Sequence, residues 1–238
     1  MASDQGTRQD PRSLLAALLA LTAVSGLVDA VSYLGLGHVF TANMTGNVVV
    51  LGFAAAGAPG FSASATATSL GVFLAGGVLG GQLARRVPGR RRLLLAAMAA
   101  EAVAVGAAAL IVFLAGLAPG WQRLSAITFL ALAMGIRNAA VRRLAVKDLP
   151  TTVLTQTLTA LAADSRFAGG DDIRAGRRIA AAACMLAGAV AGALIFRHVN
   201  TALPLLVAAA ITAATAILVR VSPAAPATPR RGSGEETS

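Results

Sequence analysis

The feature that most constrains the fold is an internal repeat in which each copy contains an apolar segment too short to cross a membrane. Equivalent positions lie 109 to 112 residues apart, as in the pairs Gly26 and Gly135, Thr45 and Thr155, and Leu74 and Leu186. Because this offset drifts only slightly, we interpret the copies as a duplication with small changes in loop length. Repeated halves with short apolar segments in matching places are typical of transporters whose site lies between the halves.

The composition indicates an integral membrane protein. Hydrophobic residues make up 56% of the 238 residues and charged residues only 13%, about half the charged share of a soluble domain. The net charge is +10, but the basic residues lie at the ends of apolar segments and are hardly interleaved with aromatic side chains. This pattern favours arginines that hold loops on the cytoplasmic side, beside the lipid headgroups, over binding to nucleic acid.

Eight apolar stretches follow one another along the chain. About 20 residues of helix span the hydrocarbon core of a bilayer. Six stretches are close to that length or longer: 14–36, 66–84, 93–118, 124–141, 179–196 and 201–219. The other two, 42–57 and 151–163, are shorter, and the second is rich in threonine.

We expect one membrane domain flanked by two disordered cytoplasmic termini. The termini, residues 1–12 and 222–238, are polar, and the second is rich in Pro, Ser, Gly and Glu. The domain covers 13–221, with the two repeats at about 14–118 and 121–220.

The distribution of arginines decides how many stretches cross the membrane. With six crossings and both termini inside, the basic segments 85–92, 137–147 and 164–178 all lie on the cytoplasmic side, and only Arg123 and Arg197 lie outside. This arrangement satisfies the positive-inside tendency. Each repeat then contributes three crossings, an odd number, so the second copy is inverted relative to the first.

We therefore predict an all-α, polytopic membrane helix bundle with six crossings, two short half-helices or re-entrant helices, and an inverted internal repeat. The short helices approach the symmetry axis from opposite faces of the membrane. The alternative is eight helices in two parallel four-helix halves, which places several basic loops, including 85–92, on the outer side.

Two acidic residues lie within apolar stretches and are candidate functional groups. Asp29 lies deep in the first crossing, and Glu101 lies about nine residues into the stretch that begins at 93. A carboxyl group inside a membrane is costly unless it is paired, so both should face protein or water. Asp29 is either a proton-coupling or substrate-binding carboxylate, or a packing group bound to neighbours such as Asn43 or Asn47.

Arg137 and Asn138 are the counterparts of Val28 and Asp29 in the second copy. Arg137 is the obvious partner for Asp29 if the repeats face each other. The competing interpretation, slightly favoured, is that Arg137 lies near the cytoplasmic end of its helix and extends to the headgroups. We expect Asn138 to contribute a hydrogen bond to a polar site.

The two short segments are the candidate ligand-lining elements. In the run 41–47, Asn43, Thr45 and Asn47 are suited to cap a helix start, and Gly46 allows an unusual backbone angle or a close approach. In the second copy, Thr151 and Thr155 are candidates by the same logic. Half-helix N-termini within a membrane attract anions and polar ligands, whereas threonines in membrane helices also bond their own backbone.

Other motifs indicate packing rather than chemistry. The small-residue tracts 71–81 and 187–192 match the small-xxx-small pattern of close helix contacts, which leaves a homodimer through such faces open. His38, His198 and the single Cys184 have no companions at metal-ligand spacing, and no phosphate loop or nucleophile motif is present. We therefore expect no metal and no cofactor.

The motifs Gly26-Leu-Val-Asp29-Ala30 and Phe40-Thr-Ala-Asn43-Met-Thr45-Gly46-Asn47 resemble those of the YoaK family, bacterial membrane proteins grouped as domain of unknown function 1275. Gly135-Ile-Arg137-Asn138-Ala139 fits the second block of that family, although Arg137 stands where glutamine is common and Gln156 where glycine is usual. The resemblance covers about 14–220. It implies a multi-pass inner-membrane protein and supplies no substrate.

Together these features favour a small secondary transporter or permease for a small polar or anionic solute, proton-coupled through Asp29, in the bacterial inner (plasma) membrane with both termini cytoplasmic. The alternative is a membrane scaffold or sensor whose buried polar network only fixes the fold. An enzyme is disfavoured, because only Asp29 and Glu101 offer acid or base groups and no nucleophile accompanies them.

Overall fold

The structure is a computed structural model that describes residues 11–144, 154–163 and 175–222. The described part consists of eight α-helices and their loops, without a strand. The helices are α1 (Pro11–Gly35), α2 (Met44–Ala55), α3 (Ala63–Arg86), α4 (Arg90–Ala115), α5 (Trp121–Arg143), α6 (Leu154–Ala163), α7 (Ala175–His198) and α8 (Leu203–Val221).

Six of these helices are long and apolar enough to cross a membrane: α1, α3, α4, α5, α7 and α8. Helices α2 and α6 have 12 and 10 residues, or about 18 and 15 Å of helix. Since the hydrocarbon core is about 30 Å thick, neither crosses it. The predicted all-α bundle with six long apolar helices and two short ones is confirmed.

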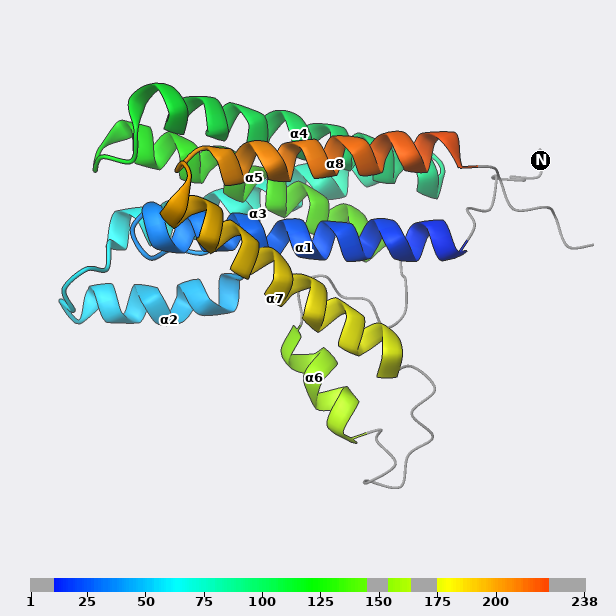
Figure 1. Cartoon of the computed structure of the whole chain (residues 1–238), viewed down its shortest axis with the longest axis horizontal. Helices are drawn as coiled ribbons and strands as arrows, with labels where there is room; N and C mark the ends of the chain where they lie inside the picture. The colour runs from blue at the N-terminus through cyan, green and yellow to red at the C-terminus, as the bar shows by residue number, and fades with distance from the viewer. Residues whose placement is uncertain (1–10, 145–153, 164–174, 223–238) are drawn as a thin grey trace, which may run out of the picture.

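The long helices run side by side with alternating directions (Figure 1). We call the end of the bundle at which α1 begins and α8 ends the terminal end, and the other the distal end. Helices α1, α4 and α7 run toward the distal end, and α3, α5 and α8 run back (Figure 1). The short helix α2 lies at the distal end, whereas α6 lies under α7 in the terminal half of the view.

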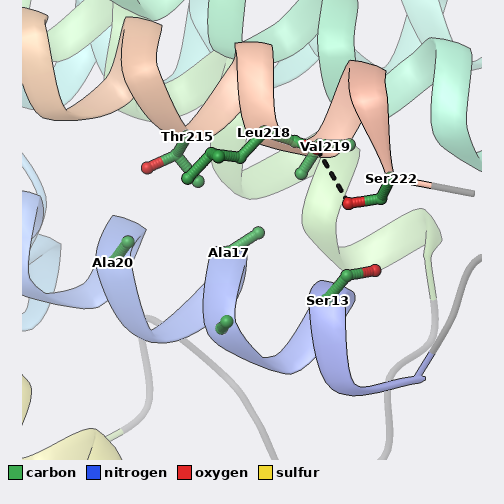
Figure 2. A pocket seen from close by; sticks show the side chains of 8 residues that line it. Ser13, Ala17, Ala20, Thr215, Leu218, Val219 and Ser222 are labelled. Carbon is green, nitrogen blue, oxygen red and sulfur yellow. Dashed lines mark hydrogen bonds between the residues drawn. The ribbon is translucent and has the colours of Figure 1, made fainter.

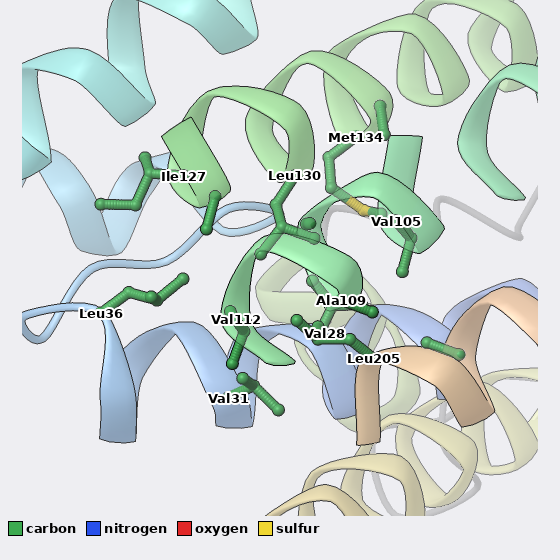
Figure 3. Packing of buried hydrophobic residues seen from close by; sticks show 14 of the residues in the cluster. Val28, Val31, Leu36, Val105, Ala109, Val112, Ile127, Leu130, Met134 and Leu205 are labelled. Atoms are coloured by element: carbon green, nitrogen blue, oxygen red, sulfur yellow. The ribbon is translucent and has the colours of Figure 1, made fainter. Parts of the chain in front are cut away.

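The largest apolar core lies where α1, α4, α5 and α8 meet. Val28 of α1, Val105 of α4, Leu130 of α5 and Leu205 of α8 are fully buried in this cluster (Figure 3). A second cluster, nearer the terminal end, joins α1, α4, α5 and α8 through residues that include Leu21. The polar side chains discussed below are therefore held among rigid, closely packed helices.

Glycines bring α1 against α7, and α3 against α5. A Cβ atom on Gly188 of α7 would lie 1.9 Å from the carbonyl oxygen of Ala23, and one on Gly76 of α3 would lie 2.6 Å from that of Leu132. The helix backbones thus approach too closely for any side chain at these positions. This confirms the prediction that the small-residue tracts pack helices together.

Each helix contact made by one half of the chain has an equivalent contact made by the other half. Gly188 packs on Ala23 and Gly76 packs on Leu132, and these two contacts are equivalent in the repeat. The same holds for a second pair of contacts, in which Gly26 lies against the Met185 carbonyl and Gly135 lies against the Phe73 carbonyl. At the level of helices, the pairs α1–α7, α2–α3 and α3–α4 have the counterparts α5–α3, α6–α7 and α7–α8. The repeat found in the sequence is therefore matched by equivalent packing.

Candidate functional site

The segment between α1 and α2 folds back into the bundle and is held there by Asp29. The Oδ1 atom of Asp29 accepts hydrogen bonds from the backbone N–H groups of Thr41 and Ala42, at 2.9 and 2.8 Å. Asp29 lies six residues before the end of α1 at Gly35, or about 9 Å along the helix. After α1 ends, the chain therefore turns back by about 9 Å into the bundle, to the level of Asp29, before α2 begins. Helix α2 is thus a re-entrant half-helix.

Asn47 holds the same segment from the other side. Its Oδ1 accepts the backbone N–H of Phe40 at 2.8 Å, and its Nδ2 donates to the Phe40 carbonyl oxygen at 2.6 Å. Nδ2 also lies 3.2 Å from the hydroxyl oxygen of Ser69 on α3, which itself donates to the Phe40 carbonyl at 2.6 Å. Asn47 is fully buried, so it ties α2, the returning segment and α3 into one unit.

The remaining residues of the 41–47 run shape the start of α2. Asn43 is the N-cap and its side chain accepts the N–H of Gly46 at 3.4 Å. A Cβ on Gly46 would lie 2.8 Å from the ring of Phe40, so the predicted close approach is confirmed. Thr45 is exposed and makes no part of this network.

A second polar cluster lies deeper in the bundle, around Arg137. The guanidinium Nη1 donates to Glu101 Oε1 at 2.8 Å and to the Leu21 carbonyl oxygen at 3.1 Å, and Nη2 donates to the hydroxyl of Ser25 at 2.5 Å. Both charged side chains are completely buried. An ion pair of this kind persists in an apolar interior only because further hydrogen bonds support the charges.

This geometry corrects the sequence-based expectations for Arg137. It does not extend to the headgroups, because none of its surface is exposed, and its ion-pair partner is Glu101 rather than Asp29. The physical reason is rotation: α5 turns this side chain toward α1 and α4 instead of toward lipid. The prediction that Glu101 pairs inward is confirmed.

The second copy supplies less of a site in the described residues. Within them, neither polar atom of the Asn138 side chain has a hydrogen-bond partner. Thr151 lies outside the described residues, as does the side chain of Thr155 in α6. Helix α2 packs on α3 and α6 on α7, so the described parts of the two short segments do not line a common surface.

A cleft of about 250 Å³ lies between α1 and α8 at the terminal end (Figure 2). It is lined on α1 by Ser13, Ala17 and Ala20, and on α8 by residues that include Thr215 and Ser222. Asp29 is not among the lining residues, and it lies nine residues beyond Ala20, about 14 Å along α1.

Sequence reasoning missed two side chains of these networks, Ser25 and Ser69. Both are fully buried hydroxyls on long apolar helices. Ser25 had a detectable signal, since it lies one helical turn before Asp29 and therefore on the same face. Ser69 had none, because its partner is a backbone carbonyl.

Six apolar helices with two half-length helices and buried charged side chains define a multi-pass membrane protein. The chain belongs to the family described as "Protein of unknown function (DUF1275)", whose model matches residues 17–218. The predicted membership of the YoaK-like family is thereby confirmed. The chain is similar to the UPF0700 transmembrane protein YoaK of Bacillus subtilis (strain 168), with 36% identity over 159 residues, covering 64% of this chain and 67% of the relative. No solved structure matches the chain.

Proposed function

We propose that this protein is a small secondary transporter or permease that carries a small polar or anionic solute, proton-coupled through Asp29. The observation that carries the proposal is the re-entrant helix α2, which begins inside the bundle directly beside a buried carboxyl group. The first N–H groups of a half-helix that starts inside the membrane are free to bind a solute. Unpaired backbone at this depth is tolerated only where it faces protein or a water-filled cavity and not lipid. The proposal assigns no enzymatic activity.

The proposal includes an inverted relation between the two halves, α1–α4 and α5–α8. It is supported by the directions of the helices, since α1 and α5 run oppositely, as do α3 and α7 (Figure 1). It is supported too by the glycine contacts that recur at equivalent positions. Inverted halves are the architecture in which rocking of one half against the other alternates access to a central site.

Orientation follows from the arginines at the helix ends. The terminal end carries most of those on the described helices: Arg12, Arg85, Arg86, Arg90, Arg91, Arg92, Arg142, Arg143, Arg177, Arg178 and Arg220. The distal end carries Arg123 and Arg197. By the positive-inside tendency, we place the terminal end, and with it both termini, in the cytoplasm of a bacterial cell whose plasma membrane holds the protein.

An asymmetry between equivalent interfaces supports a transport cycle. The interface of α1 with α8 contains the cleft, whereas the equivalent interface of α4 with α5 is packed more extensively. The repeat equivalent of Ala20, which lines the cleft, is Phe129, a larger side chain that is itself exposed. In the proposed cycle the more loosely packed interface of α1 with α8 is the one that opens.

The test is proton movement driven by a solute. Purified protein is reconstituted into liposomes that contain a pH-sensitive dye, the membrane potential is clamped with potassium and valinomycin, and small carboxylates, phosphate and amino acids are added in turn. We expect at least one class to drive proton entry that protein-free liposomes lack. Asp29→Asn should abolish it, and Ser64→Ala, an exposed position, should not. Unchanged proton entry in Asp29→Asn would remove Asp29 as the coupling group.

A second candidate function, a membrane scaffold or sensor without transport, is favoured by one observation. The side chains of Asp29 and Asn47 both form hydrogen bonds with the backbone of the returning segment. Such bonds stabilise the fold whether or not a solute binds. A purely structural Asp29 predicts a large loss of melting temperature in Asp29→Ala, which removes the acceptor of both N–H groups, and a functional one predicts little loss.

A further inference from the structure

Three charged side chains stand apart from the others on the eight described helices. Asp29, Glu101 and Arg137 lie at least six residues from the nearest helix end. Each is at most 5% exposed. Charged groups at this depth are rare in membrane helices and mark ion or proton pathways.

The three groups lie along one face of α1. Arg137 binds the Leu21 carbonyl and the Ser25 hydroxyl, and Asp29 follows Ser25 by four residues, one helical turn or about 5.4 Å further along the same face. The guanidinium is thus paired with Glu101 while a second carboxyl group lies about one turn away.

Charge and hydrogen bonding are unbalanced in this cluster. The cluster holds two carboxyl groups and one guanidinium, which pairs with Glu101, so one negative charge has no counter-ion. Oδ2 of Asp29 and Oε2 of Glu101 are both buried, and neither has a hydrogen-bond partner among the described residues. An uncompensated charge in an apolar interior is costly, so such a cluster attracts one small cation.

We infer that Asp29, Glu101 and Arg137 form a binding site for one proton, in which Arg137 is the counter-ion shared by the two carboxyl groups. A hydronium ion gives its proton to the carboxyl group that the guanidinium does not pair with, which is Asp29 in this structure, and leaves as water. When the guanidinium moves one turn along α1 to pair with Asp29, the proton is held by Glu101 instead. Loss of the proton to water leaves the unpaired carboxylate as the acceptor for the next one.

Apart from the thiol of Cys184 in the middle of α7, the other ionisable groups on the elements packed around this site lie near helix ends or in the segment after α1. On the described helices and that segment they are Arg12, Tyr33, His38, Arg85, Arg86, Arg90, Arg91, Arg92, Arg123, Arg142, Arg143, Arg177, Arg178, Arg197, His198 and Arg220. No further acidic side chain lies on these helices, so the balance of the cluster depends on its own three members.

The inference rests on the proposed transport function only in that transport would use the bound proton; proton binding itself needs no solute.

Purified protein in detergent is titrated between acidic and alkaline pH while the infrared C=O band of protonated carboxyl groups is recorded, for wild type, Asp29→Asn and Glu101→Gln. We expect wild type to keep such a band above the pH at which ordinary carboxyl groups ionise, with pKa values of about 4, and both variants to lose it there, because each leaves one carboxylate matched by Arg137. A band retained in Glu101→Gln would overturn the shared counter-ion.

Melting temperatures provide the second readout. Glu101→Gln should melt within a few degrees of wild type because Asp29 replaces it as the partner of Arg137. The double variant Glu101→Gln/Asp29→Asn leaves a buried guanidinium alone, and we expect it to melt at least about 10 °C lower. Additive effects of the two substitutions would contradict the proposal.

A triple variant and a comparison of salts test the charge argument and the identity of the bound cation. If the double variant does not fold, adding Arg137→Gln removes the lone charge and should restore folding; failure to do so would count against the charge argument. Stabilisation by sodium chloride but not by choline chloride would assign the site to sodium and overturn the proton. Proton binding without any solute-driven flux would instead refute the transporter and leave this site intact.

Discussion

The contact of Gly188 with α1 allows a quantitative prediction. A Cβ atom at this position would lie 1.9 Å from the Ala23 carbonyl oxygen, whereas ordinary van der Waals contact begins at 3.4 Å. Gly188→Ala therefore requires α7 and α1 to separate by about 1.5 Å along this line. Overpacking of a rigid interface costs about 1–3 kcal/mol and occasionally more, and the backbone atoms here have no rotamer with which to yield.

The matched control is Gly77→Ala on α3, since a Cβ atom there would meet nothing within 4 Å. Alanine is preferred over glycine in a helix by about 1 kcal/mol, so this variant should be as stable as wild type or more so. Gly188→Ala should be about 3 kcal/mol less stable than wild type, which is about 6–12 °C in melting temperature for a chain of this size. The equivalent Gly76→Ala, with 2.6 Å to Leu132, should fall between them.

The assay is thermal unfolding in one detergent, followed by the fluorescence of the single tryptophan, Trp121, and by gel filtration of heated samples. The reasoning requires the order Gly77→Ala, Gly76→Ala, Gly188→Ala from most to least stable. Equal melting temperatures for Gly188→Ala and Gly77→Ala would refute it, because the close approach of α1 and α7 would then carry no energetic weight.

Three other variants test the site. Asn47→Ala leaves the backbone N–H of Phe40 without its acceptor and should lose about 2–3 kcal/mol of stability, measured by the same thermal unfolding. Asp29→Ala should melt below Asp29→Asn by about 2 kcal/mol, because only asparagine keeps an oxygen for the two N–H groups; equal values would mean that these bonds do not hold the segment. Ala20→Phe places a large side chain in the cleft and should abolish solute-driven proton entry with little change in melting temperature. Full activity in this variant would show that the cleft is not on the solute path.

Much of the architecture was predictable because it depends on local properties. Whether a stretch such as 42–57 crosses a membrane depends on its own length against the bilayer thickness and on the basic residues of the loops beside it, so the count of six crossings needed no tertiary information. The close approach of Gly46 and the capping by Asn43 were likewise evident from residue type and spacing.

The partners of the buried charges were decided only by the tertiary structure. Arg137 lies six residues from the end of α5, where sequence alone allows it to reach either lipid or protein, and the rotation of α5 selects Glu101, 36 residues earlier in the chain. The partners of Asp29 are backbone N–H groups, which every residue except proline carries, so no side-chain pattern marks them. The sequence determined how many helices are long enough to cross a membrane and that Asp29 and Glu101 lie within them, because both follow from the apolar stretch around each residue. Whether Arg137 is buried, and how the three charges pair, depended on how each helix turns about its axis.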